Sequence, residues 1–298
     1  MKNILISSFC ILFVSVSLLS ADQPDVYALE HQALVDFYHS TNGNNWIRQD
    51  HWLSDSKPHC EWHGVICDSD GRVIEIQLYD NGLDGPLPES IGQLQNLRTL
   101  YLSFNKISGE IPESLGSDTP FLENVWLKAN RLEGEIPSTL FSGGHLKWVD
   151  LHVNNLSGAL PEDFGFNPEL SVLRLDENHL SGELPESLFN QTGLTELYLH
   201  DNQFTGQLPN SITNLSMLQH LFLGHNQFSG SLPEHVDLLE NLMTLRAEYN
   251  QFSGPIPESF SRLKALQVLR LDNNRLTLPA PDSLLEKGSK LQVFDISQ

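Results

Sequence analysis

The segment LTELYLHDNQFTGQLPNSI, from Leu194 to Ile212, recurs immediately downstream as LQHLFLGHNQFSGSLPEHV, from Leu218 to Val236. Both follow the pattern LxxLxLxxNxLxGxLPxxL, with other apolar residues at some Leu positions, and the pattern recurs along most of the chain. One such unit cannot bury its apolar side alone, so neighbouring units must stack and share a core. The regular recurrence therefore predicts a solenoid.

One asparagine marks each repeat. The set, evenly spaced except for one step that is longer by a single position, is Asn81, Asn105, Asn130, Asn154, Asn178, Asn202, Asn226, Asn250 and Asn274. This register defines nine full repeats and a partial tenth that stops at LQVFDISQ. Each asparagine follows a strand at a point where the chain turns inward. Its amide can donate to and accept from backbone groups that would otherwise be buried unpaired.

The apolar residues before each asparagine alternate, as Leu197 and Leu199 do, which is the period of a strand with one buried face. Stacked units then form a parallel sheet. A glycine suited to positive φ follows at Gly85, Gly109, Gly134, Gly158, Gly182, Gly206, Gly230 and Gly254, whereas the ninth repeat has Leu278. A proline two or three residues further on forbids a helix, so the return path is predicted to be extended or short-turn structure.

The charge balance argues against polyanionic partners. With 38 acidic residues against 17 Lys and Arg, the formal net charge of −21 repels nucleic-acid phosphates and anionic lipid headgroups. The chain also has no GxSxG, HExxH or phosphate-cradling glycine motif. The sequence therefore indicates neither an enzyme nor a cofactor-dependent protein.

The first residues, 1–21, are predicted to be a secretory signal, with Lys2, an apolar stretch over 4–19 and small residues at Ser20 and Ala21. An uncleaved anchor is the alternative. No later stretch approaches the roughly 20 apolar residues of a membrane span. Export leaves Cys60 and Cys67 in an oxidising environment, which favours a disulfide over a metal pair that would lack two further ligands.

The run NKISGEIP, from Asn105 to Pro112, together with Trp52-Leu53 and CEWHGVIC from Cys60 to Cys67, resembles the plant-type leucine-rich-repeat proteins. The resemblance implies an α/β solenoid, a curved right-handed superhelix with the parallel sheet on its concave face and a helical, disulfide-bonded N-terminal cap. Relatives of this type include receptor-like kinase ectodomains, receptor-like proteins and polygalacturonase-inhibiting proteins. The expected domains are the cap, 22–72, and the repeat solenoid, 73–298.

Both ends of the solenoid carry expectations. Apolar groups at helical spacing should cover the first repeat, namely Val26, Leu29, Ala33, Leu34 and Phe37. Trp46, Trp52 and Trp62 should pack in this cap, with an aromatic ligand pocket there as the alternative. At the other end no second cysteine pair closes the array, so the last strand is expected to be uncovered, either in a truncated gene product or as an edge that pairs with something else. Residues beyond about Leu266 are expected to fray or self-associate.

The concave face should carry function. Its central column, interpreted as exposed, comprises Gln77, Tyr101, Trp126, Asp150, Arg174, Tyr198, Phe222, Arg246, Arg270 and Asp295. Tyr, Trp and Arg favour binding hot spots. The candidate ligand-binding residues are Tyr79, Tyr101, Phe104, Trp126, Trp148, Arg174, Tyr198, Phe222, Arg246, Tyr249 and Arg270. Cross-strand stacking is the competing interpretation of the aromatic residues.

Other polar groups on this face are interpreted conservatively. A metal site formed by His200, His220 and His225 near Asp176 and Asp201 is considered but not adopted, because these positions follow no recognised ligand spacing.

The carboxylates Asp176, Glu177 and Glu248 are interpreted as surface charges on an exposed sheet, which would give too little desolvation for glycosidase chemistry. Three glycosylation sequons stand at Asn155, Asn190 and Asn214.

These observations predict an exported, secreted or cell-surface recognition module that binds a protein or peptide, or else a glycan, on its concave face. The alternative is an inhibitor of an extracellular hydrolase, which the resemblance to polygalacturonase-inhibiting proteins implies and the residues alone do not demonstrate.

Overall fold

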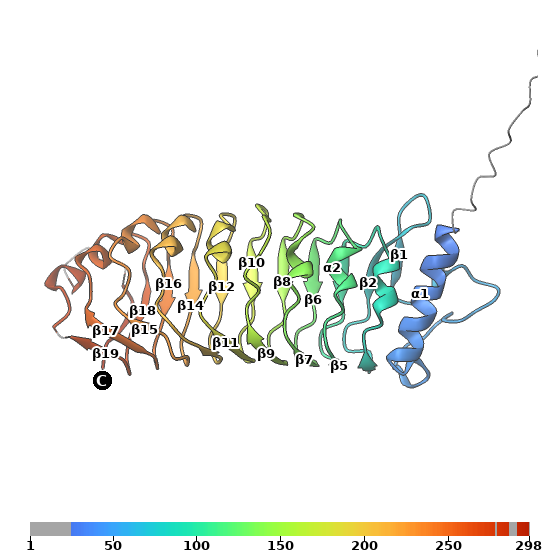
Figure 1. Cartoon of the computed structure of the whole chain (residues 1–298), viewed down its shortest axis with the longest axis horizontal. Coiled ribbons are helices and arrows are strands. Elements are labelled where there is room, and N and C mark those ends of the chain that lie inside the picture. The colour runs from blue at the N-terminus through green and yellow to red at the C-terminus, as the bar shows by residue number, and fades with distance from the viewer. Residues whose placement is uncertain (1–24, 278, 286–290, 298) are drawn as a thin grey trace, which may run out of the picture.

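A computed structural model describes residues 25–277, 279–285 and 291–297. It is a curved solenoid in which α1 (Val26–Ser40) covers one end of the stack, and the repeats follow in chain order to the opposite end (Figure 1). The predicted signal, 1–21, and Leu278 lie outside the described residues. Within the described residues, no helix is long and apolar enough to cross a membrane.

The concave sheet contains eleven strands in the described part of the chain. In spatial order they are β1 (Val65–Cys67), β2 (Val73–Gln77), β4 (Thr99–Tyr101), β6 (Asn124–Trp126), β8 (Trp148–Asp150), β10 (Val172–Arg174), β12 (Glu196–Tyr198), β14 (His220–Phe222), β16 (Thr244–Arg246), β18 (Val268–Arg270) and β20 (Val293–Asp295). Apart from the antiparallel β1–β2 pair, neighbours run parallel in a register that aligns equivalent repeat positions, as Leu173 with Leu197 and Leu197 with Leu221. The predicted parallel sheet is confirmed.

A second, discontinuous layer of strands runs along the other side of the solenoid. It consists of β3 (Asp84–Pro86), β5 (Lys106–Gly109), β7 (Arg131–Gly134), β9 (Asn155–Ala159), β11 (His179–Gly182) and β13 (Gln203–Phe204), then β15 (Ser229–Gly230), β17 (Gln251–Pro255) and β19 (Arg275–Thr277). In Figure 1 the labelled strands of this layer lie below those of the concave sheet. The extended return path is as predicted.

Short helical turns complete the return path. They are the α-helical turn α2 (Ser114–Ser117) and the 3₁₀ turns η1 (Gly43–Asn45), η2 (His59–Glu61), η3 (Glu89–Gln93), η4 (Ser138–Phe141), η5 (Glu186–Asn190), η6 (Asn210–Asn214), η7 (Val236–Leu238), η8 (Glu258–Arg262) and η9 (Asp282–Leu285). A proline precedes several of them in extended conformation, as Pro185 does with φ −71° and ψ 144°. Its fixed φ suits this entry, and its missing N–H is not needed there.

The repeat asparagines form a hydrogen-bonded ladder, as predicted. Asn178 Nδ2 donates to the carbonyl of Leu151 in the preceding repeat and of Leu175 in its own, each at 3.1 Å. Its Oδ1 accepts from the Leu156 amide at 3.0 Å. The side chain is 6% exposed, so these bonds pair backbone groups that water cannot reach.

In the first eight repeats two positions adopt a left-handed backbone, and one of them recurs in the ninth repeat at Asn273. The glycine was expected: Gly158 has φ 78°, and a Cβ there would approach Glu135 Cγ to 2.7 Å. The residue immediately before the ladder asparagine was not predicted to do so, yet Phe104, Val153 and Tyr249 have φ of 60°, 56° and 53°. This conformation costs about 1 kcal/mol for non-glycine residues. It turns the chain inward at the point where the asparagine must reach both repeats.

The N-terminal cap covers the core of the first repeat. Ala33, Leu34 and Phe37 on α1 are buried as predicted, whereas Val26, expected to pack there, is 37% exposed in the first turn of the helix. Glu30 is buried as well, because its carboxylate accepts from Arg72 Nε at 2.8 Å and from the Val73 amide at 3.1 Å. An ion pair thereby joins α1 to the first repeat strand.

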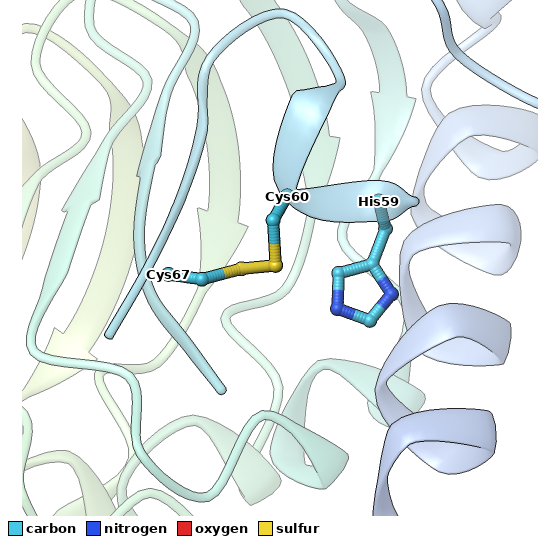
Figure 2. A group of neighbouring side chains, drawn as sticks. All are labelled: His59, Cys60 and Cys67. Atoms are coloured by element: carbon cyan, nitrogen blue, oxygen red, sulfur yellow. A yellow bond between two sulfur atoms is a disulfide. The ribbon is translucent and has the colours of Figure 1, made fainter. Parts of the chain in front are cut away.

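Aromatic residues and a disulfide complete this cap. Trp46, Trp52 and Trp62 are buried, which confirms their packing role. Cys60 and Cys67 form the predicted disulfide, and the His59 ring lies between it and α1 (Figure 2). His59 is fully buried and stacks on Tyr27 with ring centroids 4.3 Å apart.

We predict that Asn178→Ala lowers the free energy of unfolding by about 1–3 kcal/mol, because it strands buried backbone groups of two repeats. His179→Ala, the matched control, removes an exposed neighbouring side chain and should change stability by less than about 0.5 kcal/mol. Denaturant titration followed by circular dichroism measures both. Equal midpoints would show that the ladder does not support the array.

A second prediction concerns the pH dependence of the cap. Burial, and next the nearby charge of His31, lowers the pKa of His59 below its ordinary value. The folded state therefore disfavours the protonated ring, so the contribution of His59 to stability is present at neutral pH and is lost as the pH falls below about 6.5.

His59→Phe keeps the stacking on Tyr27 and cannot bind a proton. The denaturation midpoint, followed by tryptophan fluorescence at pH 7.5 and pH 5, should therefore fall more in the unmodified chain than in His59→Phe. The exposed control His179→Phe should behave like the unmodified chain, and an equal fall in all three would refute a role for His59.

Candidate functional site

The concave sheet brings the predicted central column together, one residue per strand. Register pairs align Tyr101 with Trp126 and Tyr198 with Phe222. Most of these side chains are half-buried rather than exposed, because each lies against its neighbours on adjacent strands. Asp150 departs furthest from the expectation of exposure, since it is 7% exposed and hydrogen-bonded to the buried His152 ring.

Five of the predicted residues form one continuous cluster over the first repeats, which we call the N-terminal aromatic group. The members are Tyr79, Tyr101, Phe104, Trp126 and Trp148. Tyr79 lies 5.3 Å from both Tyr101 and Phe104, measured between ring centroids. Trp126 continues the chain of contacts at 5.2 Å from Tyr101 and 6.2 Å from Trp148.

Four members of this group, all but Trp148, line a shallow hollow of about 420 Å³. Tyr79 and Phe104 are 47% and 42% exposed at its edge, although large aromatic residues are commonly buried. Lys128 and Asp150 supply one charge of each sign beside the rings, and Lys128 Nζ lies 5.1 Å from the Phe104 centroid. The hollow thus combines apolar faces with polar groups, as ligand pockets commonly do.

The second aromatic group has a different construction. Tyr198 and Phe222 stack face to face with centroids 4.6 Å apart, and their planes differ by 13°. Arg174 lies over Tyr198 at 4.5 Å, and Arg246 lies over Phe222 at 5.7 Å. Two guanidinium groups therefore enclose the stacked pair. Burial, followed by the charge of Glu196, raises the pKa of Tyr198 to about 12, so this phenol is neutral at physiological pH.

The arginines of this half of the face are paired with carboxylates two residues later in sequence. Arg246 donates from Nε to Glu248 at 2.9 Å, and Arg270 donates to both oxygens of Asp272 at 3.1 Å. Arg174 and Asp176 have the same spacing, at the longer distance of 3.4 Å. The recurring Arg-x-Asp/Glu spacing is the sequence signal from which these pairs could have been predicted.

The interpretation of Asp176 and Glu248 as surface charges is wrong. Asp176 is 1% exposed and lies against Arg174 and His200. Glu248 is 2% exposed and lies against Arg246 and Arg270. Glu177 is exposed as expected. The second half of the concave face is therefore a layer of half-buried cations over buried anions, and most of its charge is compensated within the chain.

The remaining predicted residues are dispersed. His200 Nε2 lies 3.5 Å from Asp176 and 4.0 Å from Asp201, but His225 stacks on Tyr249 at 4.4 Å. Tyr249 is thus held beside a histidine rather than in the Tyr198–Phe222 stack. The sequon residues Asn155, Asn190 and Asn214 are all exposed, as glycan attachment would require, and their modification stays a prediction.

Family profiles match both parts of the chain. The profile described as leucine rich repeat N-terminal domain matches residues 28–68. Profiles described as leucine rich repeat match residues 96–117, 145–167, 168–228 and 241–263.

Curated relatives are plant receptors. The chain is 37% identical over 109 residues to the probable inactive receptor kinase RLK902 of Arabidopsis thaliana, which is 36% of this chain and 16% of that protein. It is 39% identical over 88 residues to phytosulfokine receptor 1 of the same plant, covering 28% of this chain and 8% of the receptor. The chain therefore spans less than a fifth of the length of either relative.

Solved structures match over a larger share. The leucine-rich-repeat ectodomain of the Arabidopsis thaliana receptor kinase GASSHO1/SCHENGEN3, bound to CASPARIAN STRIP INTEGRITY FACTOR 2, gives a TM-score of 0.81 at 33% identity, covering 85% of this chain and 31% of that one. The Arabidopsis HAESA ectodomain, bound to an N-terminally extended IDA peptide hormone ligand, gives a TM-score of 0.72 at 32% identity, covering 90% of this chain and 44% of that one. A plant ice-binding protein gives 0.73 at 28% identity, covering 91% and 86%.

The two aromatic groups should differ in their effect on stability. We predict that Phe222→Ala lowers the free energy of unfolding by about 1 kcal/mol or more, because it breaks a stacked pair and uncovers Arg246. Phe104→Ala, at an exposed edge position, should cost about 0.5 kcal/mol or less. Thermal and urea unfolding of both variants measure the difference, and a larger loss for Phe104→Ala would contradict it.

Proposed function

The chain belongs to the leucine-rich-repeat proteins of the plant receptor-like type, and on that premise we propose that it is an exported recognition module that binds an extended peptide on its concave face. Binding rather than catalysis is supported by two of the matched structures, which are receptor ectodomains crystallised in complex with the molecules that they bind. Export is supported by the apolar leader over 4–19 and by the disulfide in the cap.

The observation that carries this proposal is the N-terminal aromatic group with its hollow. The rings of Tyr79 and Phe104 remain about half exposed on a sheet face where no core requires them. Clustered Tyr and Trp side chains offer large, rigid contact surfaces at little entropic cost, so they recur at the centres of binding sites. The Tyr198–Phe222 stack is less available, because two arginines already cover it.

The chemistry of the hollow favours a peptide. Matched proteins of this fold are described with ligands as different as a peptide hormone and ice, so the fold itself does not choose the ligand. The aromatic faces suit an apolar or aromatic side chain, and Lys128 and Asp150 can meet polar backbone groups beside it. With a net charge of −21, the chain attracts neutral or basic peptides more readily than acidic ones.

Inhibition of an extracellular hydrolase is the second candidate and would use the same face. The length and curvature of the face favour it, since a folded enzyme could span many repeats. The two candidates differ in what they bind, because short peptides suffice for the first and only a folded enzyme satisfies the second.

A peptide-display library selected on the immobilised full-length chain tests the proposal. Selected peptides should carry an aromatic or aliphatic residue at a recurring position. Trp126→Ala should weaken their binding by about 2 kcal/mol, roughly thirtyfold in Kd, as expected for a hot-spot aromatic residue. Isothermal titration calorimetry measures each affinity.

Glu183→Ala is the matched control, because Glu183 is exposed on the return path away from the concave sheet. Its affinity should equal that of the unmodified chain. If Trp126→Ala binds normally and Glu183→Ala does not, the ligand occupies another face. If the library yields no binder while a secreted hydrolase is inhibited, the second candidate replaces the first.

A further inference from the structure

Three metal-ligating side chains converge on the concave face where the fifth and sixth repeats meet. They are Asp176 and Glu177, which follow β10, and His200, which follows β12. One donor atom from each lies within 4.8 Å of the others. We propose that these three residues bind one zinc ion, at a site separate from the N-terminal aromatic group.

Asp176 is the anchor of this site, and its surroundings set it apart from the other buried carboxylates of the concave face. Its side chain is 1% exposed, and Oδ1 has no hydrogen-bond partner among the residues that the structure describes. Oδ2 makes only two long contacts, to Arg174 Nη2 at 3.4 Å and to His200 Nε2 at 3.5 Å. A buried carboxylate normally requires close hydrogen bonds or a metal.

Two other buried carboxylates of this face have closer hydrogen-bond donors. Both oxygens of Asp272 are hydrogen-bonded, whereas Glu248 is hydrogen-bonded through one oxygen. Asp272 accepts from Arg270 through both oxygens at 3.1 Å and from Asn273 at 2.9 Å. Glu248 holds Arg246 Nε at 2.9 Å through one oxygen. Asp176 has neither kind of close contact, although its own arginine stands two residues away as in the other pairs. Arg174 instead places its guanidinium over the Tyr198 ring.

The two partners of Asp176 supply the other donors. His200 Nδ1 has no hydrogen-bond partner in the described part of the chain, and 24% of its side chain is exposed. Glu177 is exposed, so its carboxylate is free to rotate toward the other two. Asp176 is buried, whereas Glu177 and His200 can adjust their side chains. The donor atoms, which now lie within 4.8 Å of one another, can therefore move closer to bind one ion.

The donor set selects the class of ion. One imidazole and two carboxylates suit a borderline divalent cation, and zinc binds such ligands at about 2.0–2.2 Å. Two carboxylates neutralise its charge, which offsets the repulsion from Arg174. Three protein ligands leave at least one coordination position open, and this position would face solvent on the concave side, as in zinc sites that exchange a ligand.

The test uses the full-length chain after treatment with a chelator and removal of the chelator. Isothermal titration with ZnCl₂ should show saturable binding with one ion per chain. His200→Gln and Glu177→Gln should each weaken that binding at least tenfold. Substitution of Co²⁺ should give visible absorption bands, which His200→Gln should remove.

His179→Gln and Glu183→Gln are the matched controls. Both residues are exposed on the return path, and the two substitutions remove the same types of metal-binding group as His200→Gln and Glu177→Gln. Their zinc affinity should be unchanged. Thermal unfolding of every variant without metal verifies that each is folded. Absence of stoichiometric binding, or binding that persists in both His200→Gln and Glu177→Gln, would overturn the site. Loss of binding in His179→Gln would assign the ion to scattered surface histidines and would overturn it equally.

Discussion

Pairing of buried backbone groups between successive repeats is the constraint on which the structure depends. Each turn of the solenoid sends its chain inward after a short strand, where peptide groups are shielded from water. Asn178 and its equivalents bridge these groups across two repeats, donating to carbonyls of both repeats and accepting from an amide. Because the ladder joins equivalent positions of successive repeats, it keeps every strand in the same register as its neighbour.

That register determines what the concave face can offer. Because equivalent positions of adjacent repeats lie side by side, a residue type that recurs once in every repeat becomes a continuous line on the surface. Tyr101 beside Trp126 and Tyr198 beside Phe222 are two results of this rule. The first pair belongs to an open cluster with exposed rings at its edge, while the second is enclosed by Arg174 and Arg246. The same geometry thus produces one surface suited to a ligand and one suited to internal cohesion.

Charge follows the same lines. An arginine ends each of the strands β10, β16 and β18, and a carboxylate stands two residues later, just past the strand end, so the two side chains lie against each other. In Arg246–Glu248 and Arg270–Asp272 the guanidinium covers the acid closely. In the Arg174–Asp176 pair the guanidinium is displaced onto Tyr198, and the acid has His200 as its other partner. A local preference for stacking over ion pairing therefore changes the chemistry of one repeat without altering the fold.

The amino-acid sequence alone predicts the solenoid, its period, the parallel sheet, the ladder asparagines and the disulfide of Cys60 with Cys67. Each rests on local patterns that recur or on residues a few positions apart. It also identified the aromatic residues of the concave face, since period and alternation place them there. Three features emerge only from the folded chain: the burial of Asp176 and Glu248, the exposure of Val26, and the separation of the aromatic residues into an open and an enclosed group. These features depend on side-chain contacts between repeats. Whether a side chain is covered depends on the size and rotamer of the equivalent residue in the next repeat. The period of the sequence does not specify that size or rotamer.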